Sequence, residues 1–316
     1  MNITWYDKNN DIYSPEVAPN CQFLKKLISF DADAVQNVIN IIFSEQKFLD
    51  IFMKNAQGMS NVFDKLNIRI GLVNKSDQTE YIESTTVDSS VIFIGNDDDE
   101  NKYLSIFNNR ACIVSNSCHS SISTIGYQRH LSNEVNTNSI SLSELREDFS
   151  AAESKMRAVR SIFFKKSAVK KQDSYSQRSR ITGIDIYECC QLIRYAGLSS
   201  ELDFFFINAE EESGNENIWD FITTSIWYYL EGKTHKNIDD KAENKKIYLV
   251  DCEFFDDAIV FIKSEITNRW WFKHPISEMQ VPCSENDYNS LRVGQIPDLM
   301  SAQLFVEGET IAVKGS

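Results

Sequence analysis

The sequence predicts an α/β fold of three layers, in which helices cover both faces of a mostly parallel sheet, followed by a small β-rich C-terminal appendage. Up to Gly232, short β-like runs alternate with helical patterns, as in parallel α/β proteins. Some of these runs are apolar throughout, which is typical of strands buried on both faces. After Gly232, β-like runs follow one another without helices between them, which favours an antiparallel meander.

The first elements expected are one long helix and three strands. Residues 34–56 place apolar side chains near a 3.6-residue period, which predicts a long amphipathic helix. Strands are expected over Asn67–Val73, Ser90–Ile94 and Arg110–Ser115, and the second of them ends in a glycine.

The next elements continue the alternation of helices and strands. The expected order is a helix over 143–159, a strand over Ser161–Phe164, a helix over Asp185–Tyr195, a strand over Leu202–Ile207 and a helix over Asn217–Glu231. These elements complete the predicted parallel sheet with its covering helices.

Two of the predicted helices carry terminal signals. Asp185, with Glu188 three residues later, predicts a capping box at the start of one helix. Gly197 is then the expected C-cap of that helix, and Gly232 is expected to close the helix after it.

The chain is predicted to divide near residue 244. Residues 1–244 form the α/β domain, of which the first 90 or so are divergent, and 245–316 form a tail packed on it. Strands are expected over Ile247–Val250, Ala258–Lys263 and Arg269–Lys273. The Trp270–Trp271 pair is expected to pack this tail onto the domain.

Composition excludes several classes of protein. The 316 residues include 32 Lys and Arg against 46 Asp and Glu, a net charge of −14, so we expect no binding to nucleic acid. No apolar run approaches the ~20 residues that span a bilayer, so no membrane insertion is expected. The N-terminus lacks the apolar core of a signal peptide, which predicts a cytoplasmic protein. The seven irregularly spaced cysteines predict reduced, mostly buried thiols.

Positive charge is concentrated in one segment. Residues 155–180 contain nine basic residues and one acidic residue, a local charge of +8, so the remainder of the chain carries −22. One interpretation is an exposed loop that offsets acidic neighbours. The other is a loop that binds an anion or a partner protein through Lys165, Lys166, Lys170, Lys171, Arg178 and Arg180.

Several segments resemble the ureohydrolase superfamily of arginase, agmatinase and formimidoylglutamase. They are ITGIDIYECCQLIRYAGLS at Ile181–Ser199, DFFFI, IWDFITTSIWYYLEG, and STIGYQRHL at Ser123–Leu131. The tail, with IVFIKSEITNRWWFKHP and VPCSENDYNSLRVGQIPD, is most similar to arginase-like proteins of Bacteroidota. The resemblance covers roughly residues 120–298 and implies the ureohydrolase fold.

The resemblance also implies where an active site would lie. Active family members bind two Mn²⁺ ions with two His and four Asp at strand ends, and the metals activate a bridging hydroxide. Here the first motif has no His, although Asp99 matches an Asp. In the second motif, His119 is one position out of register and two other residues replace carboxylates. The replaced ligand positions of the second and third motifs are Asn116, Ser120, Lys165 and Ser167, and Asn208 stands where a substrate-binding Glu is expected.

These departures predict that the binuclear manganese site is lost and that no catalytic residue remains. The resulting interpretation is a pseudoenzyme that acts as a binding or scaffold subunit, with a protein partner or as a homo-oligomer. The alternative is a metal-dependent or altered C–N hydrolase of the arginase or formimidoylglutamase type, in which Asp99, Cys118 or His119 would carry the altered chemistry. A residual metal or small ligand near Asp99 is also left open.

One hypothesis concerns what replaces the metal. Lys165, at a former ligand position, could place its ammonium near the vacated cation site and compensate Asp99 or another remaining acid. The acidic run Asp97–Glu100 itself favours a solvated turn over a Ca²⁺ or Mg²⁺ loop, because it lacks the alternating spacing of such loops.

Overall fold

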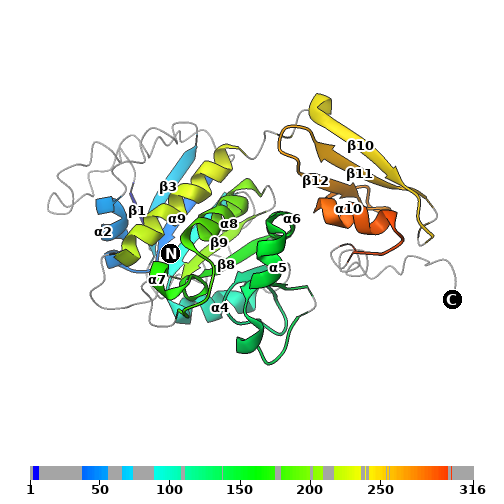
Figure 1. Cartoon of the computed structure of the whole chain (residues 1–316). Coiled ribbons are helices and arrows are strands. Elements are labelled where there is room, and N and C mark those ends of the chain that lie inside the picture. Colours follow the sequence, from blue (N-terminus) through cyan, green and yellow to red (C-terminus); the bar gives the residue numbers. More distant parts are fainter. Residues whose placement is uncertain are drawn as a thin grey trace.

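The structure is a computed structural model, and it contains two separate sheets. It describes residues 3–6, 38–55, 66–73, 89–107, 111–136, 138–174, 179–199, 202–208, 217–235, 239, 242–253, 255, 257–297 and 300. A nine-stranded sheet precedes a four-stranded antiparallel sheet along the chain (Figure 1). Both the mostly parallel sheet and the small C-terminal sheet were predicted from the sequence, and both are confirmed.

The large sheet has the strand order β1-β3-β2-β4-β9-β8-β5-β6-β7, and only β1 runs antiparallel to its neighbour. Its central strands are apolar on both faces, as parallel strands covered by helices must be. Their bounds are β1 Ile3–Tyr6, β2 Val38–Phe43, β3 Asn67–Val73, β4 Ser89–Gly95, β5 Ala111–Val114, β6 Ser123–Tyr127, β7 Ile140–Ser141, β8 Ser161–Lys165 and β9 Phe204–Asn208.

Helices cover both faces of this sheet. On one face Tyr103 of α4 packs against Phe204 of β9 at 5.6 Å between ring centroids. On the other, Tyr229 of α9 stacks on Phe205 at 5.0 Å, within a core that α2, α6 and α8 also enter (Figure 1). The helices are α2 Gln46–Asn55, α4 Asp97–Phe107, α5 Leu142–Glu147, α6 Phe149–Arg157, α7 Lys171–Ser174, α8 Ile186–Leu198 and α9 Asn217–Thr234, with short 3₁₀ turns η2 Arg129–Leu131, η3 Lys166–Ala168 and η5 Ala242–Asn244.

Two helix predictions were wrong in part. The expected helix over 34–56 is the buried strand β2 followed by α2, because five apolar residues in a six-residue strand mimic a helical period over a short window. The expected helix over 143–159 is two helices. Asp148 ends α5 and then caps α6 by accepting a hydrogen bond from the Ser150 amide at 2.9 Å.

The capping box at Asp185 and Glu188 is confirmed, but the two glycines have a different role from the one predicted. Gly197 lies inside α8, whose C-cap is Ser199, and Gly232 lies inside α9. A Cβ on Gly197 would lie 3.0 Å from the Gly232 Cα and would overlap the Tyr229 carbonyl. These glycines therefore allow α8 and α9 to approach closely, since no side chain separates the two backbones.

The C-terminal sheet has the order β10-β11-β12-β13. Its strands are β10 Lys245–Val250, β11 Ile259–Ser264, β12 Trp270–Lys273 and β13 Gln280–Cys283, followed by α10 Glu285–Arg292. One face packs on α10, where Trp270 stacks against Tyr288 at 4.8 Å. Along the described residues, no helix is long and apolar enough to cross a membrane.

Candidate functional site

Three central strands of the large sheet end side by side. In the register of the sheet, Gly95 at the end of β4 pairs with Asn208 at the end of β9, which pairs with Lys165 at the end of β8. Because parallel strands place their carboxyl ends at one edge, the residues that follow these strands meet there. This edge is where the sequence placed the candidate site.

A buried carboxylate connects the three strand ends. Glu100, in the first turn of α4, is only 2% exposed. Its Oε1 lies 2.6 Å from the Lys165 Nζ, and its Oε2 accepts a hydrogen bond of 2.7 Å from the Asn208 side-chain amide. We call Glu100, Lys165 and Asn208 the strand-end cluster. It neutralises a carboxylate that would be costly to bury alone.

The start of α4 holds Glu100 in this place. The Asn96 amide donates to the Asp99 carboxylate at 3.1 Å, and the Asp99 amide donates to the Asn96 side chain at 3.2 Å. A Cβ on Gly95 would lie 2.8 Å from the Asp99 Oδ2 and 2.9 Å from the Phe93 ring, so glycine leaves room for this approach. Burial, and then the Asp99 charge, raise the pKa of Tyr103 one turn later. Asp99 and Glu100 are thus buried at a helix start, and the predicted solvated turn was wrong for these two residues.

The other ligand positions inferred from the sequence lie nearby but form different contacts. Asn116, after β5, donates a hydrogen bond of 3.2 Å to the Ser167 carbonyl, which follows β8. Ser120 is exposed in the loop before β6, where its carbonyl accepts from Asn136. Cys118 lies 3.4 Å from the Ser139 hydroxyl. The first two contacts join loops and present no carboxylate to the strand-end cluster.

The described residues do not fit a dimanganese site. Such a site needs several carboxylate or imidazole ligands around two cations. The carboxylates that the described residues place at these strand ends are already engaged, Asp99 by the backbone of α4 and Glu100 by Lys165. Across the described ranges, no group of three or more His, Cys, Asp and Glu could hold a metal ion. Glu210, Glu211 and Glu212 lie outside the described residues.

The fold buries some of the basic residues of the 155–180 segment and exposes others. Lys166 is buried at 1% exposure, and Lys165 points to Glu100, so neither stands on an exposed loop as the partner-loop interpretation required. Lys170 pairs with Asp173 at 3.3 Å, and its neighbour Lys171 is exposed. Arg180 is also exposed, and Arg178 lies outside the described residues. A partner-binding role for the exposed members stays a prediction.

Comparison with solved structures gives the fold a known counterpart. A crystal structure of Trypanosoma cruzi formiminoglutamase with Mn²⁺ aligns with 66% of this chain and 96% of its own, at a TM-score of 0.51 and 12% identity. The chain has the formiminoglutamase fold. A variant of the same enzyme with Mn²⁺ aligns at a TM-score of 0.50 and 11% identity, and the alignment covers 67% of this chain and 97% of the enzyme. The agmatine ureohydrolase of Thermoplasma volcanium aligns at a TM-score of 0.46 and 11% identity, and the alignment covers 68% of this chain and 96% of that enzyme.

The TM-scores of the two formiminoglutamase structures establish the fold, and identities of 11–12% establish no activity. No protein-family model and no curated protein matches the sequence. What the site does must therefore be argued from its own residues.

Sequence reasoning missed Glu100 as the residue that Lys165 would compensate. Helical spacing could have found it, because Glu100, Tyr103 and Leu104 recur at three and four residues and so share one face of α4. Tyr103 and Leu104 pack on the sheet, which places Glu100 against the strand ends as well.

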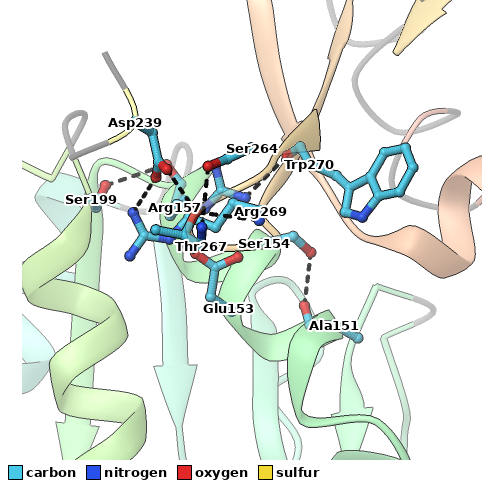
Figure 2. Close-up of polar contacts among 10 residues, drawn as sticks. All are labelled: Ala151, Glu153, Ser154, Arg157, Ser199, Asp239, Ser264, Thr267, Arg269 and Trp270. Atoms are coloured by element: carbon cyan, nitrogen blue, oxygen red, sulfur yellow. Dashed lines mark hydrogen bonds and ion pairs between the residues drawn. The ribbon is translucent and has the colours of Figure 1, made fainter. Parts of the chain in front are cut away.

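A second polar cluster joins the two sheets (Figure 2). Arg157 of α6 is buried, pairs with Glu153 at 2.5 Å and donates to the Trp270 carbonyl at 3.1 Å. Arg269, before β12, contacts Glu153 at 3.3 Å and Asp239 at 2.8 Å. A cavity of about 440 Å³ adjoins this cluster. Its lining arginines, Arg194 and Arg269, already have carboxylate partners in the chain, so we interpret the cluster as a joint.

Proposed function

We propose that this protein is a catalytically inactive ureohydrolase-like protein that acts as a binding or assembly subunit. The observation that carries the proposal is the ion pair between Lys165 and Glu100 at the carboxyl ends of β8 and β4. At this edge a hydrolase of this fold would gather carboxylates around metal ions. Here an internal ammonium supplies the positive charge instead.

The charge at this edge supports the loss of both metal ions. Lys165 adds a positive charge that would repel Mn²⁺ at short range. Asn116, Ser167 and Asn208 offer neutral oxygens, which neutralise no cation charge. To bind a metal ion, Glu100 would have to give up its ion pair with the Lys165 ammonium. Lys165 would then need another carboxylate partner. We therefore propose that the protein carries no manganese cofactor.

The alternative is an altered hydrolase that uses Asp99, Cys118 or His119. Local contacts hold two of these residues. The His119 amide donates to the Thr124 hydroxyl at 3.0 Å, and the Asn96 amide binds the Asp99 carboxylate. The first contact fixes the backbone of a loop. The second engages the Asp99 carboxylate at a helix start, which favours the inactive interpretation. We further propose a cytoplasmic location, as expected from the N-terminal sequence.

An activity assay tests the proposal. The purified protein would be preincubated with Mn²⁺ and assayed for hydrolysis of arginine, agmatine and formiminoglutamate, with the T. cruzi formiminoglutamase as positive control. We expect no product above that of a heat-denatured sample. Turnover that Asp99→Asn or Glu100→Gln abolishes, while the folded fraction stays the same, would contradict the proposal and support the altered hydrolase.

A further inference from the structure

Strand β10 is the outer edge of the small sheet (Figure 1). Two of its exposed residues are apolar. Ile247 and Leu249 are each 68% exposed, on the face opposite to α10. They alternate with Tyr248 and Val250, which point into the core of the small sheet. An edge strand with exposed apolar residues is an open template for pairing with another strand.

The opposite edge of the same sheet is protected, whereas no described strand pairs with the outer side of β10. Strand β13 contains Pro282, which cannot donate a hydrogen bond to a further strand, and it packs against α6. The stretch from Ile247 to Val250 has no charge, proline or glycine. Among the described residues, the only strand that pairs with β10 is β11. The sheet thus has one closed edge and one edge ready for pairing.

The hydrogen-bond pattern shows which groups of β10 point to the open side. The Asn244 carbonyl accepts from the Glu265 amide at 2.8 Å, so the even-numbered residues of β10 hydrogen-bond to β11. By alternation, the backbone N–H and C=O groups of Lys245, Ile247 and Leu249 point away from β11. A second strand could bond to these groups without changing the first pairing.

We propose that β10 pairs antiparallel with β10 of a second copy of this chain, which joins the two small sheets into one across a twofold axis at Tyr248. In this register Ile247 of one copy faces Leu249 of the other, and Lys245 faces Asp251. The outward-pointing groups of the two strands then match, and the exposed apolar side chains cover one another. Moving the register by two residues in either direction loses the pairing of Lys245 with Asp251.

Charge complementarity is what favours a second copy over another partner. The strand begins with Lys245 and Lys246 and is followed by Asp251 and Glu253. An antiparallel copy therefore brings a basic end beside an acidic end at both sides of the axis, as an isologous interface requires. The surface lies away from the strand-end cluster, so the inference does not depend on the absence of metal.

The test is the mass of the full chain in solution. Sedimentation and light scattering of the wild type should give twice the 36.3 kDa of one chain. Leu249→Arg should halve that mass, whereas the control Val293→Arg should leave it unchanged, because Val293 is equally open at 73% exposure but lies beyond α10. Thermal unfolding would verify that both variants fold. A monomeric wild type, or a dimer that Leu249→Arg leaves intact, would overturn the proposal.

Charge reversal tests the register itself. Lys245→Asp alone places two acids opposite each other and should weaken the dimer, and Lys245→Asp with Asp251→Lys should restore it. Hydrogen exchange gives a local readout, since the Ile247 and Leu249 amides should be protected in the dimer and lose that protection in Leu249→Arg. A dimer in which these amides exchange freely would place the interface elsewhere and contradict the inference.

Discussion

Replacing Lys165 by Met should destabilise the protein by more than the loss of a surface ion pair. The variant keeps the aliphatic volume of the side chain and leaves the Glu100 carboxylate, 2% exposed, without its cation. The Asn208 amide would remain the only other group of the strand-end cluster to stabilise the charge. Glu100 must then hold a carboxylate that is removed from water and has no adjacent cation.

The magnitude follows from the geometry. Two unit charges about 3 Å apart attract by roughly 5 kcal/mol at an effective dielectric constant of about 20. Removing one partner of a buried pair costs about 3–5 kcal/mol. Because the Lys165 side chain is 32% exposed, water replaces part of its interaction with Glu100. We therefore expect the free energy of unfolding to fall by about 2 kcal/mol.

The control is Lys170→Met. The Lys170 side chain is 30% exposed, close to Lys165, but its partner Asp173 is 21% exposed and lies 3.3 Å away. Urea unfolding should show a loss below about 1 kcal/mol for this variant. Equal losses for the two lysines would refute the reasoning, since the carboxylate is far more buried in the Lys165 pair than in the Lys170 pair.

A double-mutant cycle separates the ion pair from general packing. Glu100→Gln should cost less than Lys165→Met, because the partly exposed ammonium can be rehydrated whereas the buried carboxylate cannot. The double variant should be close in stability to Glu100→Gln alone, with a coupling energy of about 1–2 kcal/mol. A coupling energy near zero would mean that the two charges do not stabilise each other.

Three further predictions concern the rest of the fold. Gly197→Ala should lower the free energy of unfolding by about 3 kcal/mol in a urea titration, because its Cβ has no room against α9; an unchanged value would mean that α8 can shift. Arg157→Ala should cost about 3–5 kcal/mol by removing a buried partner of Glu153, whereas Arg160→Ala, whose side chain is 52% exposed, should cost under about 1 kcal/mol. Alkylation mapped by mass spectrometry should modify the half-buried thiols first and spare the buried ones. Burial raises the pKa of the Cys112 thiol to about 12, which keeps it protonated and unreactive. Labelling of Cys112 in the native protein would contradict its buried position. Among the described cysteines, the half-buried thiols are those of Cys118 and Cys252.

The fold was largely predictable because its signals are local and repeated. Apolar runs such as Phe204–Ile207 can be satisfied only inside a covered sheet, and the Asp185 capping box fixes a helix start without reference to the rest of the chain. The secondary-structure prediction was wrong where one sequence pattern is compatible with two different structures. Strand β2 is apolar throughout most of its length and so fits a helical period. Gly197 follows the apolar pattern of a helix, as a C-cap glycine would, but it lies inside α8 and serves close helix packing.

The candidate site was predictable only in part. The structure pairs Lys165 with an acid, Glu100, and the replacement of a metal ion by this ammonium stays a prediction. Which carboxylate meets the ammonium depends on the rotation of α4 about its axis, which the packing of Tyr103 against Phe204 and Phe206 sets. No residue spacing along the chain reports that rotation directly. The joint between the sheets was missed for the same reason, since Asp239 and Arg269 meet only in three dimensions.

Manganese binding tests the central claim most directly. The purified, chelator-treated chain would be dialysed against Mn²⁺ at a concentration that saturates the T. cruzi formiminoglutamase as a control, and the bound metal would be measured by mass spectrometry. The account predicts no stoichiometric Mn²⁺ in the wild type and no change in its thermal stability with added Mn²⁺. Binding of two Mn²⁺ per chain that is lost in Glu100→Gln would show that metal ions displace Lys165 from Glu100, and it would contradict the account.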